Sequence, residues 1–197
     1  LIKFIHMKRE LFIGLMSGTS IDGVDCALVT FEDNKLELVT THFEETTTSL
    51  RESILKLSAG IDISLNLFGK THVAVGKAFA NAVQNLLKKT NINAEDVTAI
   101  GSHGQTVWHR PLEKTPFTIQ IGDANTIAQH TGITTVADFR QRDIVLGGQG
   151  APLAPLLHKK LFFHAQFDRA IINIGGMANL TALPRDGKCF SYDTGPV

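Results

Sequence analysis

Several residue types that mark particular protein classes are scarce in this sequence. Only two cysteines occur among 197 residues, and Cys26 and Cys189 are far apart and follow no CxxC pattern. A disulfide scaffold and a thiolate metal site are therefore not expected, and a reducing compartment fits best. Lys plus Arg equals Asp plus Glu at 19 each. With no excess of positive charge, nucleic acid is not an expected partner.

Long apolar runs are also missing. The run at residues 11–16 is too short for the core of a signal peptide. The longest uncharged stretch, residues 144–157, is interrupted by glycines and prolines and is shorter than a membrane span. Hydrophobic residues make up 43% of the sequence and charged residues 19%. This composition is typical of a packed globular protein, which we expect to be cytoplasmic, with no membrane partner.

The hydrophobic pattern predicts an α/β fold. Three strands open the chain, with a turn at Asp33-Asn34, and a long helix runs from Ser64 to Lys88-Lys89. A helix from Asp123 to Gly132 and a helix over residues 153–163 follow. The expected strands of this part are residues 11–16, 26–31, 36–41, 97–102, 118–121 and 134–139. Because strands alternate with helices, we expect a mixed sheet.

The end of the chain repeats its beginning in outline. Strands are predicted at residues 170–174, 180–183 and 189–192, which form a second three-stranded meander. Two such meanders indicate a duplicated fold whose lobes face each other across a cleft. We expect one lobe over residues 1–168 and the start of a second lobe over residues 169–197. A meander without covering helices cannot bury its apolar face, so the chain is interpreted as an N-terminal fragment.

Residues 14–25 read GLMSGTSIDGVD and are the first candidate site. Glycine amides and the hydroxyls of Ser17, Thr19 and Ser20 can cradle phosphate oxygens. The loop is not a Walker A motif, because no Lys follows Gly18. A hairpin loop in which Ser20 and Asp22 bond their own backbone is the alternative. The glycines at positions 175 and 176 and Asn179, at the matching place of the second meander, favour a nucleotide.

Residues 101–106 read GSHGQT and follow a predicted buried strand. Polar side chains at a strand end of an α/β sheet project into the crevice where ligands bind. Gln105 and Thr106 are therefore candidates for binding substrate hydroxyls. His103 is interpreted as a hydrogen-bonded core histidine, because no carboxylate or Cys stands at ligand spacing. The sequence predicts no metal site built from its own side chains.

Two charged segments complete the candidates. Residues 138–143 read DFRQRD, and Arg140 and Arg142 either form a solvated salt-bridge cluster or bind a carboxylate or phosphate. Residues 192–196 read YDTGP. Asp193 is either a turn former or, if it faces a cleft, a base that takes a proton from a hydroxyl nucleophile.

Together these segments closely resemble the anhydro-N-acetylmuramic acid kinase family of the sugar kinase, actin and heat-shock chaperone ATPase superfamily. The matching segments are residues 14–25, 100–109, 119–123, 137–143, 147–153, 173–180 and 192–196. The resemblance implies an actin-like (ribonuclease H-like) ATPase fold with a truncated second lobe. It spans about the first half of a full-length member, so the fragment is expected to be inactive alone.

The resemblance also implies an activity. Family members use ATP, Mg²⁺ and water to open the anhydro bridge of 1,6-anhydro-N-acetylmuramic acid and phosphorylate its C6 oxygen, which serves peptidoglycan recycling. The catalytic carboxylate of the family falls on Asp193. Arg140 and Arg142 are hypothesised to anchor the lactyl carboxylate of the sugar. The ATP phosphate-binding segment falls on Gly18, Thr19, Ser20, Ile21, Asp22, Gly23, Val24 and Asp25.

This sequence departs from the expected pattern at three positions. Met16 stands where many relatives in the superfamily have an Asp, which leaves Asp22 or Asp25 to organise Mg²⁺. Gln141 stands where an Arg is expected, and Val197 where the family has Gly. Two other functions stay open: a nucleotide-responsive binding module without turnover, because the fold alone does not fix function, and a kinase for another amino sugar. A homodimer also stays open.

Overall fold

The computed structural model describes residues 10–32, 35–61, 63–174 and 177–196. The chain divides into two compact units, one made of Leu1–His109 with Ile119–Asp138 and the other of Arg110–Thr118 with Phe139–Val197. Each unit is described by itself. Within the described residues, no helix combines the length and the apolar character that crossing a bilayer would require.

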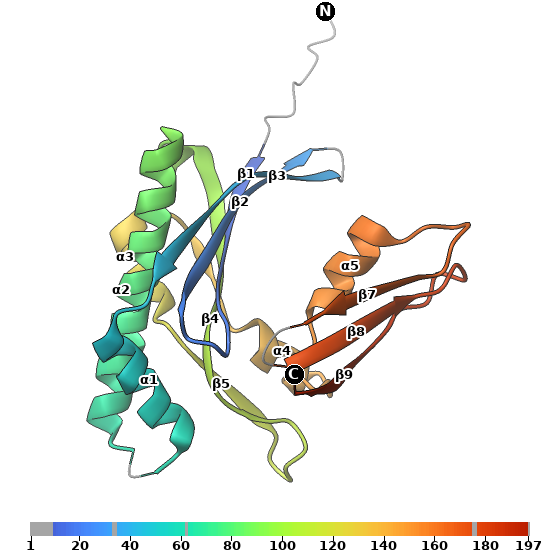
Figure 1. Cartoon of the computed structure of the whole chain (residues 1–197). Coiled ribbons are helices and arrows are strands. Elements are labelled where there is room, and N and C mark those ends of the chain that lie inside the picture. Colours follow the sequence, from blue (N-terminus) through green and yellow to red (C-terminus); the bar gives the residue numbers. More distant parts are fainter. Residues whose placement is uncertain (1–9, 33–34, 62, 175–176, 197) are drawn as a thin grey trace, which may run out of the picture. The chain divides into compact units, whose positions relative to one another are not determined.

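A mixed six-stranded sheet forms the frame of the first unit (Figure 1). Its order is β3-β2-β1-β4-β5, and β6 also pairs with β4. Strand β1 is antiparallel to β2 and parallel to β4, which is also parallel to β6. The predicted N-terminal meander is thereby confirmed, although its turn at positions 33 and 34 lies outside the described residues. The strands are β1 (Glu10–Ser17), β2 (Gly23–Glu32), β3 (Lys35–Glu45), β4 (Val97–Arg110), β5 (Phe117–Ile121) and β6 (Thr135–Val136).

Three helices accompany this sheet: α1 (Thr48–Ala59), α2 (Leu65–Thr90) and α3 (Ala124–Thr131), with a short 3-10 turn, η1 (Ala94–Asp96), before β4. Ser64 caps α2 by accepting a hydrogen bond from the Leu67 amide at 3.0 Å. The helix ends at Thr90, just after the lysine pair, and Asn91 caps it with a left-handed backbone. This long helix is the one that the sequence predicts. Helix α1 was not predicted.

The core of the first unit lies between α2 and the sheet. Val75, Phe79 and Leu86 of α2 belong to one buried cluster with Ile13 of β1 and Ile100 of β4. Full burial of one such side chain stabilises the fold by about 1.5–3 kcal/mol. The core therefore fixes the register of β1 and β4, the two strands that carry the first two candidate motifs.

Two strand predictions need correction. The strand expected over residues 97–102 continues to Arg110, so residues 101–106 lie inside β4 and not beyond its end. Gly101, Ser102 and Gln105 have ladder partners on β1, and β5 extends the sheet on the other side of β4. The strand expected over residues 134–139 is only two residues long. It stops because Asp138 adopts a left-handed backbone, with φ 62°, and Phe139 begins a helix.

The second unit contains a three-stranded antiparallel sheet of order β7-β8-β9. This confirms the second predicted meander, but the glycines at positions 175 and 176 lie outside the described residues. His158 of α5 shares a 2.9 Å hydrogen bond with the Thr181 hydroxyl of β8. The elements are α4 (Phe139–Val145), α5 (Ala154–Phe162), β7 (Arg169–Asn173), β8 (Met177–Leu183) and β9 (Phe190–Pro196). Both units combine strands with helices, so the predicted α/β class is confirmed.

Candidate phosphate loop and carboxylate site

The loop between β1 and β2 is short and internally bonded. The Ser20 hydroxyl donates to Asp22 Oδ1 at 2.6 Å, so these two side chains bond each other. Ile21 has a positive φ of 52° and a buried side chain, and its amide donates to the Gly18 carbonyl at 3.2 Å. The hydrogen bond from Ser20 lowers the pKa of the Asp22 carboxyl. The loop therefore presents an ionised carboxylate beside exposed hydroxyls at neutral pH.

The eight residues expected to hold phosphate differ in accessibility. Thr19, Ser20 and Asp22 are exposed, and Gly18 is half-buried. Asp25 is also exposed, on the strand that follows. The remaining three, Ile21, Gly23 and Val24, are buried. These three can contribute backbone groups and support, whereas the exposed hydroxyls and carboxylates can touch a ligand.

Gln105 of β4 supports the start of the loop. Its Oε1 accepts a hydrogen bond from the Ser17 hydroxyl at 2.6 Å, and its Nε2 donates to the carbonyls of Gly18 and Thr106, each at 3.2 Å. Its side chain is 2% exposed. Its amide group is thus occupied inside the fold, although the sequence suggested a contact with substrate hydroxyls. Thr106 is half-buried, and its hydroxyl accepts from Gln120 at 3.2 Å.

Helix α1 also reaches the loop. Arg51 donates to the Ser20 carbonyl at 3.4 Å, and the Thr46 amide donates to the Asp22 carbonyl at 2.9 Å. Arg51 was not among the residues predicted from the sequence to lie at this loop, because α1 was not predicted. The cap signals of this helix, Thr47 at its start and Gly60 at its end, were present in the sequence.

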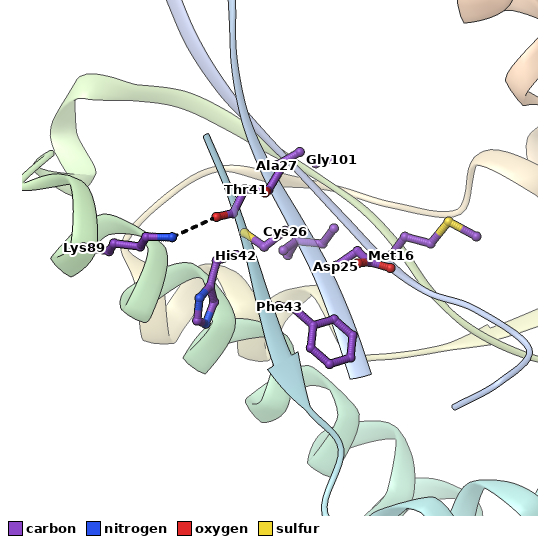
Figure 2. Close-up of a pocket in the computed structure, with 11 residues that line it drawn as sticks. Met16, Asp25, Cys26, Ala27, Thr41, His42, Phe43, Lys89 and Gly101 are labelled. Atoms are coloured by element: carbon purple, nitrogen blue, oxygen red, sulfur yellow. Dashed lines mark hydrogen bonds between the residues drawn. The ribbon is translucent and has the colours of Figure 1, made fainter. Parts of the chain in front are cut away.

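A hollow of about 450 Å³ lies over strands β1 to β3 in the first unit (Figure 2). Asp25 and Met16, which are register partners on β2 and β1, both line it. Lys89 of α2 also lines it and donates to the Thr41 carbonyl at 3.4 Å. Burial raises the pKa of Cys26, another lining residue, to about 12. The thiol is therefore protonated and unreactive at neutral pH.

His103 is half-buried in β4, and its Nδ1 lies 2.8 Å from the Gly104 carbonyl oxygen. This is the hydrogen-bonded histidine that the sequence favoured over a metal ligand. Among the described residues, no group of three or more His, Cys, Asp or Glu side chains is placed to hold a metal ion.

The second unit holds the other two candidate segments. Asp193 is exposed in the middle of β9, opposite Asn179 of β8. Arg140, expected after a strand, lies in α4 and donates to the Gly150 carbonyl at 2.7 Å. Burial lowers the pKa of Arg140, while the charge of Asp193 raises it. The guanidinium and the Asp193 carboxylate therefore attract each other within this unit. Arg142 is exposed on the same helix.

Gln141 has a structural role that an arginine could not perform. Its Oε1 accepts a hydrogen bond from the Thr118 amide at 3.2 Å. An arginine side chain carries donors only, so it could not accept this bond. The next carboxylate, Asp143, accepts from the Gly150 amide at 2.7 Å. Arg140 and Asp143 thus both bond to the backbone of Gly150. The charged residues of the segment 138–143 are therefore not only a solvated salt-bridge cluster.

Comparisons with known proteins agree with these motifs. A curated anhydro-N-acetylmuramic acid kinase from Coxiella burnetii is 53% identical over 192 residues, which are 96% of this chain and 51% of the relative. One from Vibrio cholerae is 48% identical over 189 residues, with the same shares. The chain thus spans about half the length of these curated relatives.

A solved structure shares the fold at low sequence identity. A reductive activator for a corrinoid, iron-sulfur protein superposes with a TM-score of 0.55 at 14% identity, covering 96% of this chain and 32% of the other. Such a likeness concerns the fold alone. The family model for anhydro-N-acetylmuramic acid kinase matches residues 10–197, which include the candidate phosphate loop, the Arg140 segment and Asp193. This chain belongs to the anhydro-N-acetylmuramic acid kinase family.

Proposed function

We propose that this chain is the N-terminal part of an ATP-dependent kinase that opens 1,6-anhydro-N-acetylmuramic acid with water and phosphorylates its C6 oxygen. The products are N-acetylmuramic acid 6-phosphate and ADP, and the place of action is the cytoplasm, in peptidoglycan recycling. The observation that carries the proposal is the family match from residue 10 to residue 197. The full-length protein that contains this sequence is called the parent protein below.

The loop after β1 is the proposed site for the ATP phosphates. Its exposed hydroxyls at Thr19 and Ser20 can donate to phosphate oxygens, and its backbone is held by Gln105 and Arg51. Magnesium commonly binds through one or two carboxylates together with substrate phosphates. The exposed carboxylates of Asp22 and Asp25 fit that donor set, and the lowered pKa of Asp22 keeps it ionised. When bound, Mg²⁺ would neutralise charge on the phosphates.

Asp193 is the proposed general base. Its carboxylate takes a proton from the water that attacks the anomeric carbon. The new bond forms between the water oxygen and C1, and the bond between C1 and O6 breaks. The released O6 attacks the γ-phosphorus of ATP, the bond to the β-phosphate oxygen breaks, and ADP leaves. The carboxylate charge of Asp193 acts on the Arg140 guanidinium, so the proposed base and this arginine interact.

The two arginines of α4 are proposed to bind the lactyl carboxylate of the sugar. Arg142 is exposed and can offer a guanidinium fork to a carboxylate. Arg140 is half-buried and already donates to the Gly150 carbonyl, so only part of its donor capacity is open to a ligand. We therefore assign the larger share of this contact to Arg142.

The testing experiment is mass spectrometry of the product made by the parent protein from ATP, Mg²⁺ and 1,6-anhydro-N-acetylmuramic acid. A product that has gained one phosphate and one water supports the kinase with coupled hydrolysis. If the folded parent protein binds ATP and forms no product, the proposal fails and the protein is a nucleotide-responsive binding module. If N-acetylglucosamine is phosphorylated in preference, the protein is a kinase for another amino sugar. Residues 1–197 alone are expected to show negligible turnover.

A further inference from the structure

Arg51 lies in the first turn of α1, beside the candidate phosphate loop. The Thr47 hydroxyl caps this helix by accepting a hydrogen bond from the Leu50 amide at 3.4 Å. The residue before the cap, Thr46, donates its amide to the Asp22 carbonyl at 2.9 Å. The start of α1 is thus tied to the loop through the backbone, which places the Arg51 side chain next to the loop.

The core of the first unit holds α1 in this position. Ile54 and Leu57 of α1 are both buried. Trp108 of β4 donates from Nε1 to the Leu57 carbonyl at 3.0 Å, and a Cβ atom at Gly60 would lie 2.3 Å from the indole ring. Glycine therefore lets the indole pack against the end of the helix. Because both ends of α1 are held within one unit, the placement of Arg51 at the loop does not depend on the second unit.

The guanidinium of Arg51 has donors left for a ligand. Its Nη2 donates to the Ser20 carbonyl at 3.4 Å, which is longer than a typical N–H···O hydrogen bond. A guanidinium carries five N–H donors, and this bond uses one of them. Arg51 is exposed, as are Thr19 and Ser20. A ligand bound at the exposed hydroxyls of the loop can therefore reach the remaining donors.

The charges at the loop favour a positive partner for a phosphate chain. Asp22 and Asp25 both expose carboxyl groups, so a polyphosphate bound at the loop would meet like charge. The positive charge of Arg51 acts on the Asp22 carboxylate, which shows that the guanidinium lies within electrostatic range of the loop. Arginine binds phosphate through two parallel hydrogen bonds and stays charged. Arg51 can therefore offset the negative charge of a bound phosphate chain.

We propose that Arg51 is a phosphate-binding residue of the nucleotide site, whose guanidinium donates hydrogen bonds to the phosphate chain of ATP. This inference rests on the proposed function, because it takes the loop as the site of the ATP phosphates. The alternative is a structural tie in which Arg51 only holds the Ser20 carbonyl. Such a tie needs one donor and no charge, so experiments that vary the charge separate the two roles.

The binding test compares Arg51→Gln with the unchanged parent protein by isothermal titration calorimetry with ATP and with adenosine. Glutamine removes the positive charge and keeps a polar side chain. The Kd for ATP should rise roughly 10–100-fold, which is the effect of losing a charged hydrogen bond, while the Kd for adenosine should not change. Arg51→Lys keeps the charge and loses the fork, so its loss of ATP affinity should be smaller. Lys56→Gln, at an exposed lysine of the same helix, is the matched control.

The salt dependence of ATP binding separates a phosphate contact from a structural tie. Between roughly 50 and 500 mM NaCl, ATP affinity should fall more steeply for the unchanged parent protein than for Arg51→Gln, because salt screens the charge that the variant lacks. A tie to the Ser20 carbonyl would instead lower ATP affinity by the same factor at every salt concentration. Parallel salt dependences of the two proteins would therefore overturn the inference.

The binding data also separate this inference from the proposed function, because no sugar is present in the titrations. If Arg51→Gln binds ATP more weakly than Lys56→Gln does and no sugar is phosphorylated, the Arg51 contact is supported while the kinase proposal fails. If the sugar is phosphorylated and both variants bind ATP equally well, the inference fails while the kinase proposal stands. An equal loss of ATP and adenosine binding in Arg51→Gln would also overturn the inference, and a folded parent protein that does not bind ATP would overturn both.

Discussion

The Ser17 hydroxyl donates a 2.6 Å hydrogen bond to Gln105 Oε1, which joins the end of β1 to the middle of β4. Ser17 is 4% exposed and Gln105 is 2% exposed, so water does not compete for this bond. Gln105 also donates to the carbonyl of Gly18. The first residues of the candidate phosphate loop are thus positioned by a side chain from a neighbouring parallel strand.

Replacing Gln105 should therefore disturb both the fold and the loop. Gln105→Ala leaves the Ser17 hydroxyl and the Gly18 carbonyl without their partner, which should lower the free energy of unfolding by about 1–3 kcal/mol. The KM for ATP should rise more than the KM for the sugar. Urea unfolding and steady-state kinetics of the parent protein measure both effects. Gln105→Glu keeps the acceptor for Ser17 and loses the donor to Gly18, so it isolates the second bond; an unchanged KM for ATP in both variants would contradict the positioning role.

Asp193 should be needed for turnover and not for folding. Its side chain is exposed in β9, so Asp193→Asn should fold normally. Loss of a general base should lower kcat by about 10²–10⁴-fold. The rate of product formation, followed by mass spectrometry, checks this. Asp186→Asn is the matched control, because it changes an exposed carboxylate in a turn of the same unit. Equal rates of product formation in both variants would show that Asp193 is not the general base.

Substitutions of the two arginines of α4 should differ in their effects on sugar binding and on stability. Arg142→Met should raise the KM for 1,6-anhydro-N-acetylmuramic acid by roughly 10–100-fold, which is the effect of losing a charged hydrogen bond. The KM for an analogue without the lactyl group should not change. Arg140→Met should also lower stability, because it removes the bond to the Gly150 carbonyl. Kinetics with both sugars and thermal unfolding distinguish the variants. Arg185→Met, at an exposed arginine of the same unit, serves as the control; an equal loss with both sugars in Arg142→Met would exclude a lactyl contact.

Cys26 should make stability fall at high pH. Burial raises its pKa to about 12 in the folded protein, whereas the pKa of an unfolded, solvated cysteine is near the ordinary value of 9.0. Between these values the folded state holds the proton and the unfolded state releases it, so the free energy of unfolding decreases as the pH rises. Urea unfolding between pH 8 and pH 11 should show a steeper decrease for the unchanged protein than for Cys26→Ala.

Thiol labelling gives an independent check on Cys26. In Cys189→Ser, Ellman's reagent at pH 8 should react only after unfolding, because the Cys26 thiol is 1% exposed. Fast reaction of the folded variant would contradict the buried, protonated thiol.

Local signals in the sequence predicted much of the fold. Ser64 and Gly132 mark helix ends that the structure confirms, because capping depends on the residue itself and its near neighbours. Helix α1 was missed although Thr47 and Gly60 mark its ends. The end of β4 was misplaced because residues 101–106 are small and polar, and they stay in the strand because β4 lies between β1 and β5 in the sheet.

The sequence by itself predicted the family and the α/β class, which are both confirmed, because these depend on residue types at fixed spacing. The roles of the candidate phosphate loop and of Asp193 stay predictions. The tertiary structure alone decided what several polar residues do. The Gln105 side chain points inward and holds the loop, Gln141 accepts a hydrogen bond from a backbone amide, and the Ser102 hydroxyl is buried without a partner among the described residues. These roles depend on contacts between residues far apart in the chain, and hydrogen bonds over such distances are fixed only when strands and helices pack.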